Sequence, residues 1–264
     1  MKLLELIEEL FRRNVELWIN VEKLHYRDPQ EALTPELQSK LKQYEATIIS
    51  YLRRLDGSSP PFYPLSAAQK TIWFLAQIAP HISTHKIKFD ARILSKVDVP
   101  AFRNALQALI DRHPPLRTTY ATLDGEPVQQ IHEHQEVFLE VIDSSNWSRE
   151  QLAERMREVA KCSLDLESGP LLRAYLFALP RGKYIFWLFV HQIAVDFWSF
   201  EILLEELGIL YSAEKSGIPA SLPPLDGQYT EYVRWQLNML ASPEGEKHLN
   251  YLKNQLAGEL PVLN

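Results

Sequence analysis

The hydrophobic spacing in the first part of the chain changes from helical to alternating. Apolar residues recur three and four positions apart over residues 3–11, which predicts an amphipathic helix with glutamates on its other face. Residues 15–19 alternate between apolar and polar side chains and predict a strand, and residues 24–27 predict the returning strand. We therefore expect a helix followed by a hairpin.

A second helix begins at Thr34-Pro35-Glu36. Threonine caps helix N-termini, proline fits the first helical position, and an acid suits the positive end of the helix. The apolar side chains that follow at helical spacing mark one face: Leu37, Leu41, Tyr44, Ile48 and Leu52. Because so small a module buries little surface alone and this face is longer than one hairpin covers, we expect the module to form a homodimer.

A cluster of glycine, serine and proline at residues 55–61 predicts a domain boundary. We divide the chain into a small module, residues 1–57, and a larger domain, residues 58–264. Helical and strand patterns alternate in the larger domain, which predicts a layered α/β or α+β fold with a mixed sheet. The expected strands cover residues 87–93, 116–123, 127–131, 171–179 and 184–190, and the expected helices include residues 66–74, 99–110, 152–156 and 200–211. Residues 184–190, YIFWLFV, are apolar throughout and should form a central strand covered on both faces.

Composition excludes several classes of protein. A net charge of -6 over 264 residues offers no basic surface for nucleic acid. No apolar run approaches the roughly 20 residues that a bilayer crossing needs, so we expect no membrane association. The single cysteine, Cys162, excludes an intramolecular disulfide and fits a reducing cytoplasmic location. The eight histidines lack the spacing of a metal site, and no phosphate-binding loop occurs.

The candidate chemistry lies directly after the expected central strand, in the segment FVHQIAVDFW. A lone histidine at a strand end, such as His191, is more often a satisfied core residue than a catalyst. Asp196 adds a carboxylate near the same turn. A buried carboxylate without a cation costs several kcal/mol. We therefore expect Asp196 to pair with a cation, and Arg112 or Arg117 could reach inward.

The first 55 residues resemble a known docking domain. The segment VELWINVEKLHYRDPQEALTPEL is similar to the tubulysin-type N-terminal docking domain of modular peptide and polyketide synthetases. The resemblance implies that the module homodimerises and that its hairpin receives the C-terminal tail of an upstream synthetase, at Trp18, Lys23, His25 and Arg27. An open strand edge can accept an extended peptide in this way, and the alternative is an edge covered by its own helices.

The larger domain resembles the N-terminal lobe of a nonribosomal peptide synthetase condensation domain. Four ordered segments carry the resemblance: YPLSAAQKTIWFLAQIAP, ALQALIDRHPPLRTTY, DGEPVQQI and FVHQIAVDFWS. The resemblance implies one lobe of chloramphenicol-acetyltransferase type, in a domain that joins an acyl group on an upstream carrier protein to an amine on a downstream carrier protein. No cofactor would be bound by the chain itself, and phosphopantetheine would arrive on the partner peptidyl carrier proteins.

The chain departs from that family at its signature, His-His-x-x-x-Asp-Gly. His191 matches the first histidine and Asp196 the aspartate, whose salt-bridge partner the resemblance assigns to Arg112. Gln192 replaces the second, catalytic histidine, and Phe197 replaces the glycine. Glutamine accepts no proton near neutral pH, so general-base assistance of about 10²–10⁴-fold should be missing.

These observations favour one function and leave two alternatives. The leading interpretation is a docking and partial condensation region of a nonribosomal peptide synthetase with impaired catalysis, because Gln192 and Phe197 depart from the signature and a second lobe would be needed. A stand-alone oligomeric acyltransferase of the chloramphenicol-acetyltransferase type is the enzyme alternative. An inert structural remnant is the third.

Overall fold

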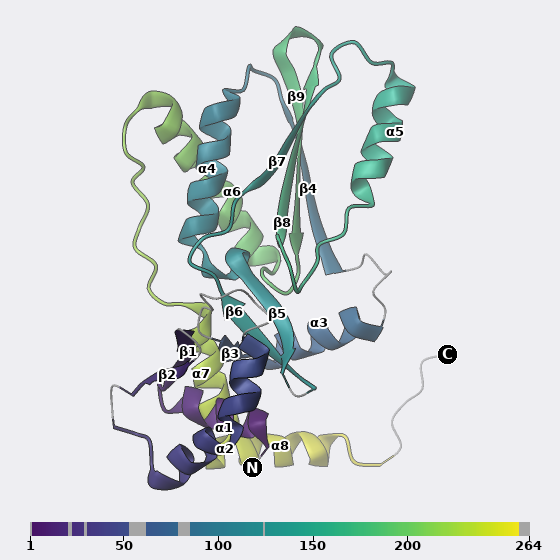
Figure 1. Cartoon of the computed structure of the whole chain (residues 1–264). Helices are drawn as coiled ribbons and strands as arrows, with labels where there is room; N and C mark the ends of the chain where they lie inside the picture. Colours follow the sequence, from purple (N-terminus) through teal and green to yellow (C-terminus); the bar gives the residue numbers. More distant parts are fainter. Residues whose placement is uncertain are drawn as a thin grey trace.

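The computed structural model describes residues 2–20, 23–28, 31–52, 62–78, 85–123 and 125–258 (Figure 1). The expected boundary at residues 55–61, Val21 and Glu22 of the hairpin connection, and Asp124 of the expected Asp-Gly turn all lie outside these residues.

The N-terminal module has the predicted order of helix, hairpin and helix. It consists of α1 (Leu3–Arg12), β1 (Glu16–Asn20), β2 (Lys23–Arg27) and α2 (Pro35–Leu52). The two strands pair in antiparallel register, with Trp18 opposite His25. The carboxylate of Asp28 then accepts hydrogen bonds from the backbone N–H groups of Ala32 (2.8 Å) and Leu33 (2.9 Å), which turns the chain toward α2.

The larger domain holds a four-stranded mixed sheet, as predicted. Its order is β4 (Lys86–Ile93), β9 (Lys183–His191), β8 (Leu172–Leu179) and β7 (Phe138–Asp143), and only the β7–β8 pair is parallel. The strand β9 lies between two neighbours and is buried from residue 185 to residue 191, which confirms the central strand. The helices α4 (Val99–Arg112) and α6 (Phe197–Ser216) cover one face, and α5 (Arg149–Ala160) covers the other (Figure 1).

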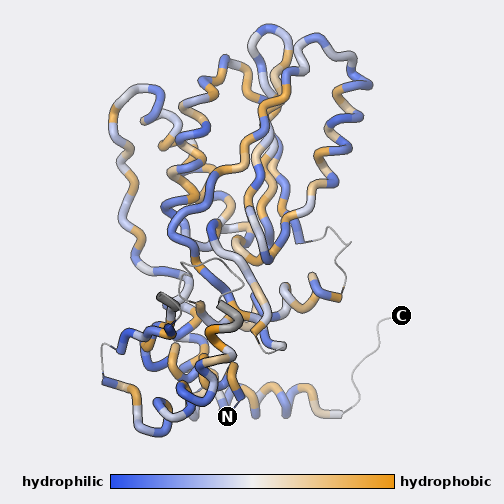
Figure 2. Tube along the Cα trace, in the orientation of Figure 1, coloured by the Kyte–Doolittle hydropathy of each residue, from blue (hydrophilic) through white to orange (hydrophobic). Residues whose placement is uncertain are grey.

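A second, three-stranded sheet links this domain to the N-terminal module. Its order is β3 (Phe62–Pro64), β6 (Glu126–Ile131) and β5 (Thr118–Leu123). The helix α3 (Ala67–Ile78) follows β3. Two further helices, α7 (Tyr229–Leu240) and α8 (Pro243–Gln255), were not predicted from the sequence, and neither were β3 and β7. Figure 2 shows hydrophobic positions on the strands and on α7 and α8. On these two helices several large side chains, such as Trp235 and Leu252, remain exposed.

The module and the larger domain share one hydrophobic core. Leu6 and Leu10 of α1 and Ile48 of α2 belong to the same buried cluster as Phe62 and Val128 of the three-stranded sheet. Burial of this kind contributes roughly 1.5–3 kcal/mol for each large apolar side chain. The module is therefore packed onto the domain.

Polar contacts reinforce this packing at two places. The Lys70 ammonium lies 2.6 Å from a carboxylate oxygen of Glu8. The guanidinium of Arg234 on α7 lies over the ring of Phe11, 4.7 Å from its centroid, and donates to the Phe11 carbonyl at 3.1 Å. The contacts come from α3 and α7, so two separate elements of the larger domain hold α1 in place.

The shared core removes the reason for expecting a homodimer. Leu37, Leu41 and Ile48 of the predicted apolar face are all buried within the chain, and the side chain of Leu52 lies outside the described residues. Dimerisation would therefore need a different surface.

Among the described residues, no helix combines the length and apolar character that a membrane crossing requires.

Candidate functional site

The candidate motif lies where the central strand ends. The strand β9 ends at His191, residues 192–194 form a turn, and α6 begins at Phe197. Backbone contacts hold the start of the turn, because the N–H of His191 donates to the Leu171 carbonyl (2.9 Å) and the N–H of Gln192 donates to the His85 carbonyl (2.7 Å). The motif therefore extends from the central strand of the domain into a helix N-terminus.

His191 has the environment of a structural residue. Its side chain is only 6% exposed, and its Nδ1 accepts a hydrogen bond of 3.1 Å from the backbone N–H of Ile193. Burial, with a smaller contribution from the nearby His85, lowers the pKa of His191 from 6.5 to about 4. The imidazole is therefore neutral at physiological pH and shapes the turn.

The structure corrects the expected pairing of Asp196 with Arg112. Asp196 is exposed and acts as the N-cap of α6, accepting hydrogen bonds of 2.7 Å from both the backbone N–H and the hydroxyl of Ser199. These bonds lower the pKa of its carboxyl group. An exposed carboxylate at a helix N-terminus needs no buried cation, which is why the expectation failed.

Arg112 pairs instead with Glu206, which lies further along α6. Its Nε lies 3.0 Å from a carboxylate oxygen of Glu206, and another guanidinium nitrogen donates to the Pro223 carbonyl at 2.5 Å. His113 contacts the same carboxylate at 2.6 Å. The hydrogen bonds from these two side chains lower the pKa of Glu206 against the opposing effect of burial. The other candidate, Arg117, donates to the carbonyl of His132.

The two residues that depart from the family signature are both exposed. Phe197 is the first residue of a regular helix and its side chain is 74% exposed, so the phenylalanine fills no space within the described chain. The side chain of Gln192 is also exposed, at the edge of the turn. Neither residue has a positive φ, so neither strains the local backbone.

A buried polar network contacts the turn at the Ile193 carbonyl. No sequence motif indicated this network directly. The Tyr120 hydroxyl lies 3.5 Å from the Ile193 carbonyl and accepts a hydrogen bond of 3.1 Å from the Gln69 amide. Gln129 contacts the same Gln69 amide at 3.4 Å. Burial raises the pKa of Tyr120. The one signal in the sequence was Gln69, a polar residue on the apolar side of the helix predicted at residues 66–74. Such a position indicates a buried hydrogen-bond partner but does not identify it.

The hairpin residues form a second candidate surface. Trp18 is half-buried and stacks on the exposed ring of His25 opposite it, with ring centroids 5.9 Å apart. Arg27 is exposed and lies 2.7 Å from a carboxylate oxygen of Glu16 on the neighbouring strand. Part of its charge is therefore already balanced. Lys23 is exposed at the start of β2. Within the described chain β1 and β2 form a two-stranded sheet, so each has one edge without a strand beside it.

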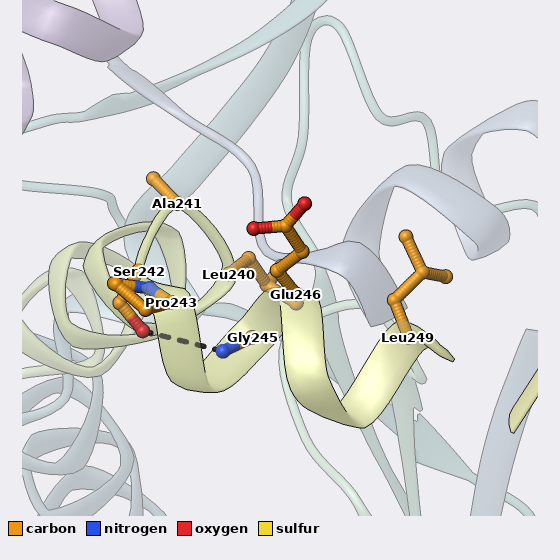
Figure 3. Close-up of a pocket in the computed structure, with 7 residues that line it drawn as sticks. All are labelled: Leu240, Ala241, Ser242, Pro243, Gly245, Glu246 and Leu249. Atoms are coloured by element: carbon orange, nitrogen blue, oxygen red, sulfur yellow. Dashed lines mark hydrogen bonds between the residues drawn. The ribbon is translucent and has the colours of Figure 1, made fainter. Parts of the chain in front are cut away.

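A surface cavity of about 470 Å³ lies at the turn between α7 and α8 (Figure 3). It is lined by Leu240, Ala241, Ser242, Pro243, Gly245, Glu246 and Leu249, and the Ser242 hydroxyl accepts a hydrogen bond of 3.3 Å from the Gly245 N–H. Among these residues only Glu246 is ionisable. The cavity therefore lacks the polar groups that a catalytic site needs, and it contains no residue of the motif.

We predict that burial of His191 makes the protein sensitive to acid. The unfolded chain binds the proton with a pKa of 6.5 and the folded chain only near 4, so folding loses stability as the pH falls through this window, by on the order of 3 kcal/mol. Replacement by asparagine, whose side-chain oxygen can still accept from Ile193, should remove this part of the loss. Urea unfolding at pH 7.5, 5.5 and 4.5 measures it, and equal acid sensitivity of wild type and His191→Asn would contradict the prediction.

We also predict that Glu206 matters more for stability than Asp196. Glu206→Gln strands the partly buried charge of Arg112 and should cost about 3 kcal/mol. Asp196→Ala removes one exposed cap and should cost about 1 kcal/mol, whereas Asp196→Asn, which keeps the cap, should cost little. Urea midpoints for the three variants test the order, and a larger loss for Asp196→Ala than for Glu206→Gln would refute it.

Two family models match the chain. The model of the condensation domain matches residues 60–264, and that of the TubC N-terminal docking domain matches residues 4–54. The first match covers more than half of the chain.

Relatives of the chain are peptide synthetases. Bacitracin synthase 2 of Bacillus licheniformis is 30% identical over 275 aligned residues, covering 100% of this chain and 10% of that protein. Tyrocidine synthase 3 of Brevibacillus parabrevis is 34% identical over 203 residues, covering 77% of this chain and 3% of that protein. The chain thus spans a small part of these relatives.

Solved structures give the same fold. The starter condensation domain of the rhizomide synthetase RzmA aligns with a TM-score of 0.67 at 22% identity, covering 76% of this chain and 51% of that one. The X-domain from teicoplanin biosynthesis, solved in a complex with OxyB, aligns with a TM-score of 0.67 at 28% identity, covering 76% and 45%. The described lobe is therefore a chloramphenicol-acetyltransferase-like half of such a domain. The chain belongs to the nonribosomal peptide synthetase family, as a TubC-type docking domain followed by the N-terminal part of a condensation domain.

Proposed function

We propose that this chain positions its synthetase behind an upstream partner and provides one wall of the site at which two carrier-bound groups are joined. The observation that carries the proposal is the physical union of its two parts. The docking-type module, whose strand β2 is largely exposed, shares a buried core with the three-stranded sheet of the condensation-type domain. We propose residues 1–57 as the docking part and residues 58–264 as the condensation part.

The substrates would be brought by other proteins. A condensation domain implies partner carrier proteins that bear phosphopantetheine, and the chain itself would bind no cofactor. A substituted form of the rhizomide domain has been crystallised in complex with C8-CoA and Leu-SNAC. We propose the two corresponding chemical classes for this chain: an acyl thioester as donor and an aminoacyl thioester as acceptor.

The upstream partner would bind at the hairpin. We propose that a C-terminal peptide of an upstream synthetase pairs with the open edge of the hairpin, with Trp18 and His25 as an aromatic surface and Lys23 and Arg27 as cations. Main-chain pairing supplies affinity in such complexes, and side chains supply selectivity. The ion pair of Arg27 with Glu16 leaves Lys23 as the stronger electrostatic contributor.

We predict that charge reversal at the hairpin weakens docking. Lys23→Glu with Arg27→Glu should lower affinity for the C-terminal segment of the upstream synthetase about tenfold at low salt, and less at high salt, because salt screens the attraction. Calorimetry at two ionic strengths measures both effects. The matched control is Arg181→Glu with Lys183→Glu, an exposed pair at the turn between β8 and β9. Unchanged affinity and salt dependence in the hairpin variant would show that its cations take no part.

Amide formation in this chain would be slow. Gln192 cannot act as a general base, and the exposed Phe197 stands where the second half of the domain would face the turn. We predict that the chain, supplied with a C-terminal half, forms the amide from loaded donor and acceptor carrier proteins at least about 10²-fold more slowly than its Gln192→His/Phe197→Gly variant. Gln192→His alone should remain slow. Equal rates for the unmodified and restored proteins would overturn the proposed impairment.

Homodimerisation and a cytoplasmic location stay predictions. Leu37 and Leu41 are buried within the chain, so the apolar face that led us to expect a homodimer is not available for it. Sedimentation of the full chain at high micromolar concentration is the direct measurement of its oligomeric state.

A further inference from the structure

The helices α3 and α7 are bonded to each other at the start of α3. The buried Ser66 hydroxyl lies 2.9 Å from the Tyr229 hydroxyl, and the Ala67 N–H donates to the side-chain oxygen of Gln236 at 2.8 Å. Tyr229 begins α7, and Gln236 lies about two turns further along it. The two bonds therefore fix the direction of α7 as well as its position. We call these two helices the α3–α7 element.

On one side, the α3–α7 element contacts the docking module at two points. Lys70 of α3 pairs with Glu8 at 2.6 Å, and Arg234 of α7 donates to the Phe11 carbonyl at 3.1 Å. That carbonyl also accepts a hydrogen bond of 3.0 Å from the Asn14 N–H, in the turn that leads from α1 into β1. The first strand of the hairpin thus begins within a few residues of a direct contact with α7.

On the other side, the same element contacts the motif turn. Gln69, the neighbour of Lys70 in α3, donates to the Tyr120 hydroxyl at 3.1 Å, and that hydroxyl lies 3.5 Å from the Ile193 carbonyl. The side chain of Ile193 is buried in one cluster with Tyr120, and Trp73 of α3 packs against that cluster. Adjacent residues of one helix therefore reach the docking module and the group that contacts the turn.

We propose that the α3–α7 element couples the docking module to the motif turn, so that a shift of α1 changes how firmly the turn is held. A displacement of Glu8 or Phe11 would move Lys70 or Arg234, and the shared helices would carry it to Gln69 and Tyr120. Coupling between two sites is reciprocal, so a group bound at the turn would also change affinity at the hairpin. The coupling rests on the proposed function, because docking at the hairpin is the event that would move α1.

Amide hydrogen exchange of the full chain, followed by NMR, tests the coupling without any ligand. The Ile193 N–H donates to Nδ1 of His191, and the Ala194 N–H donates to the His191 carbonyl at 3.0 Å, so both exchange rates report opening of the turn. Leu188, buried in the middle of β9, reports global unfolding. The ratio of the turn rates to the Leu188 rate therefore measures the turn alone.

Two variants remove contacts between the docking module and the element. Glu8→Gln weakens the pair with Lys70, and Arg234→Gln removes the guanidinium from Phe11. We expect each to raise the ratio about two- to fivefold, which is the effect of losing one partly exposed ion pair or hydrogen bond. The matched control is Glu140→Gln, which weakens an ion pair of similar exposure with Arg155 on α5 (2.9 Å) and should leave the ratio unchanged.

A third variant shows whether the effect passes through the network. Tyr120→Phe removes the hydroxyl between Gln69 and the turn and should raise the ratio by a similar factor. Changes at distant, independent sites normally add. In the Tyr120→Phe background, Glu8→Gln should therefore raise the ratio no further, because the connection that it acts through is already broken.

Four results would overturn the coupling: an unchanged ratio in Glu8→Gln or in Arg234→Gln, an unchanged ratio in Tyr120→Phe, an equal rise in Glu140→Gln, or additive effects of Glu8→Gln and Tyr120→Phe. Each would leave the proposed function standing, since docking and amide formation do not require the coupling. No peptide enters the exchange experiment. Absence of docking in the calorimetric experiment would instead refute the proposed function, whatever the exchange rates show.

Discussion

The pairing of β9 with both of its neighbouring strands fixes the position of the motif turn that follows it. The strand is hydrogen-bonded to β4 on one side and to β8 on the other, and helices cover both of its faces. A strand held on four sides has no freedom to shift in register, because a slip of one residue would turn its apolar side chains to the wrong face. The residue that follows its last pair therefore emerges at a fixed point, and the motif turn begins there.

The turn itself is satisfied by short-range contacts. His191 accepts from Ile193 and Asp196 accepts from Ser199, so these two side chains find their partners within three residues. The long-range ion pair of the region joins Arg112 to Glu206, which fixes the end of α4 against the middle of α6. Because the turn carries no buried charge of its own, residues 192 and 197 can change without loss of the fold. The fold therefore tolerates glutamine and phenylalanine at the two positions where the resemblance leads us to expect histidine and glycine.

The sequence predicted those elements whose signal lies within their own residues. The unbroken apolar run of β9 predicted a central strand, and Thr34-Pro35 predicted the start of α2, because both signals lie within the element concerned. The predicted partner of Asp196 was wrong because α6 was expected to begin at residue 200. With the start at Phe197, Asp196 followed by Ser199 is a plain capping sequence. Glu206 was detectable as an acid on the apolar side of that helix, but its partner Arg112 was not, since 94 residues separate the two. The same limit applies to the hydrogen bond from the Gln192 N–H to the His85 carbonyl, which no spacing in the sequence predicts.

The shared core of the docking module and the lobe changes what docking can achieve. A module on a flexible linker raises the local concentration of a bound partner but leaves its direction open. Here α1 is held by Lys70 of α3 and Arg234 of α7, and its leucines lie against the sheet whose Tyr120 supports the motif turn. The hairpin therefore has a defined orientation relative to the turn within the described chain. A peptide that paired with the hairpin edge would inherit that orientation, and its synthetase would approach the condensation site from one direction. If a partner docks at the hairpin as proposed, the contacts between α1 and the lobe would set the direction of delivery as well as contribute to stability. Substitutions at Lys70 or Arg234 would then act on delivery without touching either the hairpin or the turn.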